Sequence, residues 1–104
     1  MLSDEIYQGS EYEGAATPSA WGRCDRALVT NSLSKAYGLP GLRLGWVLGP
    51  AATIEALWGH HDYTTIAPTA LSDALACAAL RPARRARLLA RGRRMLSQNY
   101  ATVA

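Results

Sequence analysis

Two apolar, β-prone runs joined by a very short connection constrain the fold of this chain more than any other feature. They span residues 27–33 and 42–48, and Gly38, Pro40 and Gly41 mark a turn between them. A parallel crossover needs about a dozen residues or more. Because this connection is shorter, we expect the two strands to be antiparallel if they are neighbours in a sheet.

The only lysine, Lys35, lies where the first of these strands should end. Ten of the eleven Lys and Arg residues are Arg, and arginine cannot serve as a nucleophilic amine because its guanidinium stays protonated. A lysine that loses its proton can add to an aldehyde. The alternative is an ordinary surface lysine, since uniqueness alone is weak evidence.

Groups that bind phosphate lie close to this lysine in the sequence. Ser32 and Ser34 precede Lys35, and Arg43 returns towards them if the strands are antiparallel. Two hydroxyls and a guanidinium can together hold a phosphate. A phosphate site beside an amine is what an aldehyde cofactor carrying a phosphate requires.

The segment 32–46, SLSKAYGLPGLRLGW, resembles the cofactor-lysine segment of class I and II aminotransferases, which are fold type I enzymes that use pyridoxal 5'-phosphate. In that family a serine three residues before the lysine and an arginine eight after it hold the cofactor phosphate; Ser32 and Arg43 occupy these offsets. Ser34 stands at a position that commonly assists. The resemblance implies that Lys35 forms a Schiff base with the cofactor and later moves the substrate proton.

A second match lies at the start of the chain. The family carries an Asp at a strand end and a Tyr three residues later, and Asp4 and Tyr7 in DEIY fit this pattern. The resemblance implies that Asp4 keeps the cofactor's pyridine nitrogen protonated and that Tyr7 donates a hydrogen bond to its ring oxygen. Taken alone, DEIY would indicate only an acidic turn, because short polar tetrapeptides recur by chance.

The resemblance also implies the fold class and the domain organisation. We expect an α/β fold, part of the large domain of a fold type I transferase, with a mostly parallel sheet, one antiparallel strand and helices after it. Residues 1–82 would be the C-terminal part of the cofactor-binding domain, and residues 83–104 a helix leading to a smaller domain. Only three residues precede Asp4, where the family has a longer strand. We therefore expect a piece of a longer protein, with little activity by itself.

The second half of the chain is helical in pattern. We expect helices over residues 51–58, 70–80 and 83–103. Seven arginines lie between residues 81 and 94, and no acidic residue follows Asp73. This charge permits an alternative function, a helix that binds nucleic acid through its phosphates. We favour arginines that stay in water or pair with acids elsewhere, because no nucleic-acid-binding motif accompanies them.

The loops carry weaker candidates. Residues 8–25 are punctuated by Gly and Pro and predict a surface excursion. His60, His61 and Asp62 include metal-ligand types, but adjacent histidines lack the spacing of a helical zinc site, so we expect no metal. In the family the loop after the first helix lies near the dimer interface and the partner's cofactor. Residues 63–65 are the candidates for that role.

Composition limits the cellular setting. No apolar run is long enough to span a membrane, and acidic residues near Met1 do not fit a signal peptide. Cys24 and Cys77 lack CxxC or Cys/His companions, and two unpaired cysteines are typical of a reducing cytoplasm. We expect a cytoplasmic protein with no membrane partner; the resemblance adds amino acid and keto acid substrates and a homodimeric intact enzyme.

The sequence thus predicts part of a pyridoxal-phosphate-dependent aminotransferase that acts through Lys35. A lyase, cyclase or decarboxylase of the same fold is an alternative, because the lysine motif reports the cofactor chemistry and not the bond that is broken. A non-catalytic fragment whose arginine-rich helix binds nucleic acid is the alternative outside enzymes.

Overall fold

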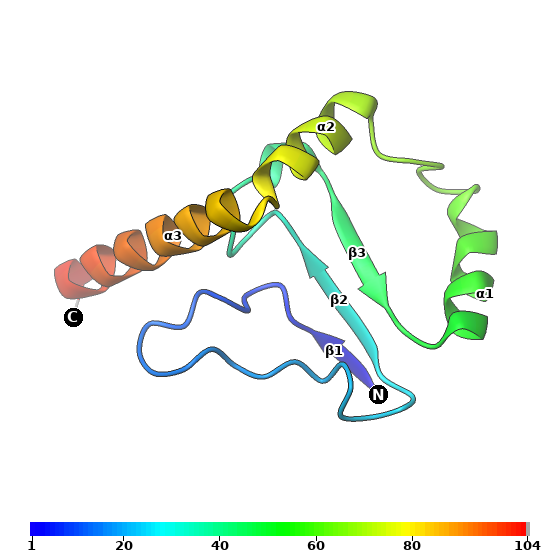
Figure 1. Ribbon diagram of the computed structural model, residues 1–104, viewed down its shortest axis with the longest axis horizontal. Coiled ribbons are helices and arrows are strands. Elements are labelled where there is room, and N and C mark those ends of the chain that lie inside the picture. The colour runs from blue at the N-terminus through cyan, green and yellow to red at the C-terminus, as the bar shows by residue number, and fades with distance from the viewer. Residues whose placement is uncertain (104) are drawn as a thin grey trace.

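A three-stranded sheet forms the centre of the computed structural model, which describes residues 1–103. The strands are β1 (Leu2–Asp4), β2 (Leu28–Ser32) and β3 (Gly45–Leu48), in the order β1-β2-β3 (Figure 1). β1 runs parallel to β2, and β3 runs antiparallel to it. The antiparallel pairing predicted from the short connection is confirmed.

The second predicted strand is shorter than expected. A 3-10 helix, η1 (Pro40–Leu42), precedes β3, and Arg43 follows it in the left-handed conformation with φ 49°. Proline suits the start of a helical turn because its φ is fixed near the helical value. A left-handed residue then interrupts any extended backbone. The prediction of a strand over residues 42–48 was therefore wrong in its first three positions.

The first helix is longer than expected. α1 (Ala51–His61) continues past the predicted end at residue 57 or 58. The His61 ring lies against Trp58 one turn earlier, with centroids 5.2 Å apart, and side chains three residues apart are neighbours on a helix. The predicted loop therefore begins later, at Asp62.

The other two helices confirm the predicted pattern. α2 (Ala70–Ala79) begins after Thr69, whose hydroxyl oxygen accepts a hydrogen bond from Ser72 N at 3.2 Å; this is a standard N-cap arrangement. α3 (Pro82–Val103) starts with a proline, which is favoured at the first helical position. Ala104, the last residue of the predicted 83–104 segment, lies outside the described residues. Within residues 1–103, no helix is both long and apolar enough to cross a membrane.

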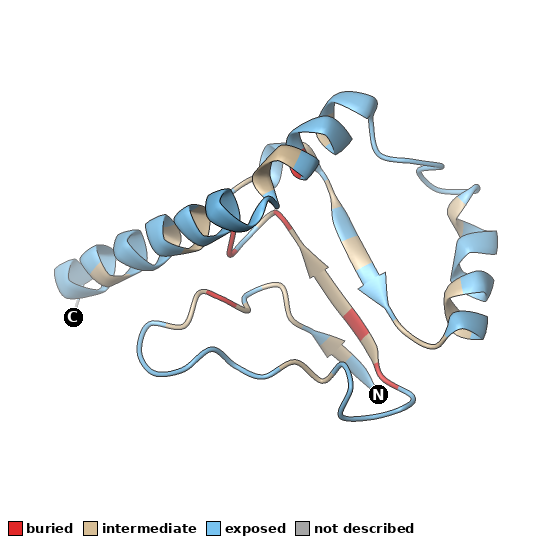
Figure 2. Ribbon diagram, in the orientation of Figure 1, coloured by how far each residue is buried: buried red, intermediate tan, exposed pale blue. Residues whose placement is uncertain are grey.

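The core centres on β2 and the loop that follows it. Figure 2 shows most of the buried positions there and others in the loop after β1 and in α2, whereas most of the helical surface is exposed. Among the residues that the structure describes, five of the six buried hydrophobic ones fall within residues 27–37, and the sixth lies in α2. They are Ala27, Val29, Leu33, Ala36, Tyr37 and Ala76. The segment that carries Lys35 is therefore also the best packed part of the chain.

Candidate functional site

Asp4 and Ser32 lie at the carboxyl ends of two neighbouring parallel strands. Asp4 ends β1 and pairs in register with Thr30 of β2, and Ser32 ends β2. In open α/β sheets, ligands bind outside the carboxyl ends of the strands. The parallel pairing therefore brings the Asp4 segment and the Lys35 segment to the same edge of the sheet.

The Asp4 carboxylate is fixed by two hydrogen bonds. Its Oδ1 accepts from Thr30 Oγ1 at 3.1 Å and from Ile6 N at 3.3 Å. Asp4 is nevertheless exposed, and a carboxylate has two oxygens with about four acceptor sites. The carboxylate is thus oriented by the fold while it keeps capacity for a further donor.

Tyr7 lies beside Asp4 in a shallow hollow of about 500 Å³. It is 64% exposed, so its hydroxyl is accessible to a ligand. The segment that carries it contacts the lysine loop, because Ala36 N donates a hydrogen bond to Ile6 O at 3.5 Å. The segment that carries Asp4 and Tyr7 is therefore hydrogen-bonded to the loop that carries Lys35.

Lys35 stands on a closed loop formed by residues 33–39. Leu39 N donates to Leu33 O, and Gly38 N donates to Lys35 O, both at 2.9 Å. Gly38 has φ +67°, a left-handed value that side chains other than glycine adopt at a cost. Leu33 and Ala36 are buried on either side, whereas Lys35 is exposed. The loop thus presents a single amine to solvent from a packed backbone.

The two serines before Lys35 are linked to each other. Ser34 N donates to Ser32 Oγ at 3.1 Å, and both residues are half-buried. A hydroxyl oxygen that accepts in this way can still donate its own hydrogen. The arrangement therefore fixes the Ser32 hydroxyl at the end of β2, where it can serve a phosphate oxygen.

Backbone pairing of the residues that follow Arg43 places Arg43 near the end of β2. Ser32 pairs with Gly45, and Leu33 N donates to Leu44 O at 3.1 Å. The left-handed conformation of Arg43 costs a non-glycine residue about 1 kcal/mol or more. Its Nη1 donates to Pro40 O at 3.1 Å, and a guanidinium has five N–H donors. The side chain is exposed, and it lines a hollow of about 990 Å³ beside β3 and α1, apart from the hollow of Asp4 and Tyr7.

The loop at residues 8–25 is organised by Glu11. Its carboxylate accepts hydrogen bonds from Thr17 N at 2.8 Å and Gly9 N at 2.9 Å. These donors, that of Thr17 first, lower the pKa of Glu11 to about 2. Arg93 of α3 lies 3.7 Å from the same carboxylate and donates from Nε to Gly9 O at 2.9 Å. Sequence reasoning gave Glu11 no structural role, since its partners are short-range amides and a distant arginine.

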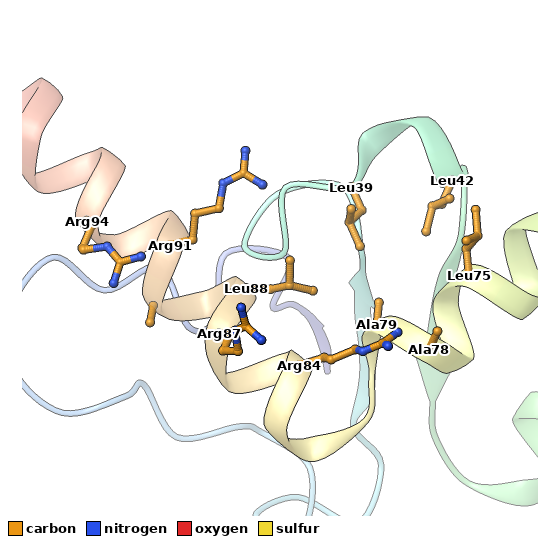
Figure 3. A pocket seen from close by; sticks show the side chains of 11 residues that line it. Leu39, Leu42, Leu75, Ala78, Ala79, Arg84, Arg87, Leu88, Arg91 and Arg94 are labelled. Atoms are coloured by element: carbon orange, nitrogen blue, oxygen red, sulfur yellow. The ribbon is translucent and has the colours of Figure 1, made fainter.

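The arginines of α3 fall into two groups. Arg85 and Arg93 bind groups of the chain itself; Arg85 Nε donates to Tyr37 Oη at 3.1 Å. The other group lines a groove of about 670 Å³ together with leucines, and Figure 3 shows these side chains. These lining residues include Arg84, Arg87, Arg91, Arg94, Leu39, Leu42, Leu75 and Leu88. The four lining arginines are exposed, as expected for arginines that stay in water, and Arg93 pairs with an acid, Glu11. The sequence did not predict the leucines that share the groove with them.

The fold has known counterparts among solved structures. The crystal structure of an aminotransferase from Mycobacterium tuberculosis matches 86% of this chain and 26% of that chain, with a TM-score of 0.74 and 40% sequence identity. The structure therefore has the fold of part of a fold type I aminotransferase, and the predicted α/β fold class is confirmed.

The sequence comparisons agree. The model of the family "Aminotransferase class I and II" matches residues 1–103, so the chain belongs to that family. It is 41% identical over 86 residues to the valine–pyruvate aminotransferase of Mycobacterium tuberculosis, covering 79% of this chain and 21% of that protein. It is 43% identical over 56 residues to the capreomycidine synthase of Streptomyces vinaceus, covering 54% and 14%. The chain spans about a fifth of the length of the first of these relatives.

Proposed function

We propose that this chain is part of a pyridoxal-phosphate-dependent aminotransferase and carries part of its cofactor site. The observation that carries the proposal is the gathering of a single exposed amine, an oriented carboxylate and a fixed hydroxyl at one sheet edge. The donor set fits the cofactor, which presents an aldehyde, a phosphate, a pyridine nitrogen and a ring oxygen. The proposed site residues are Lys35, Asp4, Tyr7, Ser32, Ser34 and Arg43.

Each residue has a separate task. When bound, the cofactor supplies an aldehyde carbon and a ring that accepts electrons. Lys35 would hold the cofactor at its aldehyde, and its Nζ would move the proton of the substrate carbon. Asp4 would keep a proton on the pyridine nitrogen, and Tyr7 would donate a hydrogen bond to the ring oxygen. Ser32, Ser34 and Arg43 would bind the phosphate.

The family suggests the wider setting of the reaction. We propose an amino acid donor and a keto acid acceptor, as in the name of the mycobacterial relative, and a homodimeric enzyme in the cytoplasm. Residues 1–82 would belong to the cofactor-binding domain, and residues 83–104 would lead to a smaller domain. Residues 63–65, after α1, would face the partner subunit.

A second function of the same site is supported by one comparison. Capreomycidine synthase, a relative 43% identical over 56 residues, is named for a synthase reaction and not for transamination. A lyase, cyclase or decarboxylase would use the same lysine and phosphate groups. Exchange of amino groups between amino acids and keto acids, measured on a full-length relative of this chain, would separate the two functions.

Trapping of the cofactor tests the proposal directly. The purified chain is incubated with pyridoxal phosphate, reduced with borohydride and digested, and the added mass is located. Only two amines can react, Lys35 and the N-terminus of Met1, so Lys35→Arg distinguishes them. We expect modification at Lys35, and Arg43→Gln should raise the half-saturating cofactor concentration by about tenfold or more, the factor for a lost charged hydrogen bond.

The matched control is Arg23→Gln, which removes the same charge from an exposed position in the 8–25 loop. It should leave the concentration dependence unchanged. A folded chain that is modified at Met1 but not at Lys35 would contradict the proposal.

A further inference from the structure

Tyr37, two residues after Lys35, is buried and makes specific contacts through both its hydroxyl and its ring. It is 6% exposed, and its hydroxyl oxygen accepts from Arg85 Nε at 3.1 Å. The guanidinium carbon of Arg85 lies 5.9 Å from the ring centroid, within the range of cation–π attraction. The ring also meets Trp46 edge-on, with centroids 6.4 Å apart. The residue next but one to the lysine is therefore held by α3 and by β3.

Arg85 belongs to a face of α3 that packs against the lysine loop, residues 33–39. Leu89, one turn later, packs against the buried cluster that includes Ala36. Gly92 is so close to the loop that an added Cβ would stand 3.2 Å from Ala36 O. Residues 85, 89 and 92 are spaced by four and three positions, which places them on one side of a helix. One face of α3 thus contacts the residues immediately after Lys35.

The direction of Lys35 depends on this contact. The loop backbone is closed by the hydrogen bond from Gly38 N to Lys35 O, and the neighbours Ala36 and Tyr37 are buried. Lys35 itself is exposed. Backbone hydrogen bonds and the buried neighbours of Lys35 together hold the loop. Loosening Tyr37 would remove part of this support and let the amine take other directions. An amine that is fixed before the aldehyde arrives loses less conformational entropy on reaction.

We infer that Arg85 is a positioning residue for Lys35. Through the Tyr37 hydroxyl it holds residues 33–39 against α3 and so fixes the amine. This inference rests on the proposed function of Lys35. Arg85 does not bind the cofactor in this scheme, so its loss changes how readily Lys35 reacts and leaves the identity of the reacting group unchanged.

The test compares Arg85→Gln and Tyr37→Phe with Arg84→Gln in the full 104-residue chain. Arg84 precedes Arg85 on the helix and lines the groove of Figure 3. The hydrogen bond and the cation–π contact to Tyr37 come from Arg85, so substitution of Arg84 removes an equal charge and leaves both in place. Pyridoxal phosphate is titrated, trapped with borohydride and quantified on the peptide that contains Lys35. Tyr37→Phe keeps the ring and removes only the hydroxyl, so it tests the hydrogen bond where Arg85→Gln also removes the cation.

The expected result is a change in concentration dependence with the same final extent of labelling. Arg85→Gln and Tyr37→Phe should each raise the half-saturating concentration by about threefold to tenfold, the factor that one net hydrogen bond gives. The double variant should have a half-saturating concentration no higher than that of the more affected single variant, because both changes remove the same contact. Arg84→Gln should stay within about twofold of the unsubstituted chain.

Amide hydrogen exchange without cofactor provides the second readout. Loss of the contact should speed exchange in residues 33–39 while β1 and the unfolding midpoint stay nearly unchanged; a merely structural role would speed exchange across the chain. Unchanged exchange and unchanged half-saturation in folded Arg85→Gln and Tyr37→Phe would overturn the inference. If the unsubstituted chain is not labelled at Lys35, the proposed function fails, and the exchange comparison alone decides the role of Arg85.

Discussion

Gly45 lies so close to Asn31 across the β2–β3 pair that an added Cβ would stand 2.9 Å from the Asn31 carbonyl oxygen. The same Cβ would stand 3.2 Å from Ser32 Cβ. Backbone atoms in a paired strand cannot move aside as the end of a flexible side chain can. Glycine at this position therefore allows β3 to pair with the strand end that carries Ser32.

Gly45→Ala should destabilise the chain for this reason. We expect the free energy of unfolding to fall by about 1 to 3 kcal/mol, the usual cost of overpacking. Gly41→Ala is the control, because nothing lies within 4 Å of an added Cβ there; it should change stability by about 0.5 kcal/mol or less. Urea denaturation measures both. Equal losses of stability at the two positions would show that the added methyl group at residue 45 is accommodated without a specific cost.

Gly92→Ala tests the approach of α3 to the lysine loop. Alanine is favoured over glycine inside a helix by about 0.5 to 1 kcal/mol. At Gly59 in α1 an added Cβ meets nothing within 4 Å, so Gly59→Ala should gain this stability. At Gly92 it would meet Ala36 O at 3.2 Å, and we expect Gly92→Ala to be less stable than Gly59→Ala by about 1 kcal/mol. Thermal unfolding of both variants gives the difference, and a gain at Gly92 equal to that at Gly59 would refute the close contact.

Glu11 should make the free energy of unfolding depend on pH in the acidic range. Its pKa is lowered from 4.5 to about 2 in the folded chain, so the unfolded chain binds its proton more readily. The carboxylate therefore stabilises the fold above about pH 4.5, and this contribution is lost as the pH falls towards 2. Glu11→Gln should lose about 1 to 2 kcal/mol at neutral pH and show a weaker acid dependence.

The measurement for Glu11 is urea unfolding at neutral pH and at several acidic values. Glu13→Gln, an exposed carboxylate in the same loop, is the matched control and should stay within about 0.5 kcal/mol. Parallel pH curves for Glu11→Gln and the unsubstituted chain would exclude this role.

Thr69→Ala should weaken the start of α2. The Thr69 hydroxyl oxygen accepts from Ser72 N at 3.2 Å, and removing such a cap costs about 1 kcal/mol. Thr102→Ala removes a hydroxyl that donates to Gln98 O within exposed helix and should be close to neutral. Circular dichroism during denaturation compares the two variants. A loss at Thr102 as large as that at Thr69 would argue against capping.

The sequence predicted the parts of the fold that are governed by local chemistry. Gly38 and Pro40 mark the turn after β2, and the short connection required the antiparallel pairing that is observed. Pro82 sits at the start of α3 because proline suits the first helical position. The early end predicted for α1 was wrong because Gly59 and two histidines weaken the apolar pattern, although Trp58 and His61 continue the helix by contact.

The contacts between distant segments could not be predicted. Arg85 and Tyr37 are 48 residues apart, and Arg93 and Gly9 are 84 apart. Each arginine resembles its neighbours on α3 in the sequence, and only the angle at which the helix crosses the loops selects these two. The motif around Lys35 predicts which residues form the proposed site, but it does not predict the left-handed backbone of Arg43 after η1.

The core and the lysine proposed to bind the cofactor lie in one short segment. Within the described residues 1–103, residues 27–37 supply five of the six buried hydrophobic side chains and also carry Lys35. A molecule that binds the loop in its folded form draws the whole folding equilibrium towards the native chain, by about 2.7 kcal/mol at a hundred times its dissociation constant. A saturating concentration of such a ligand would therefore raise the melting temperature of this chain, as a larger hydrophobic core would.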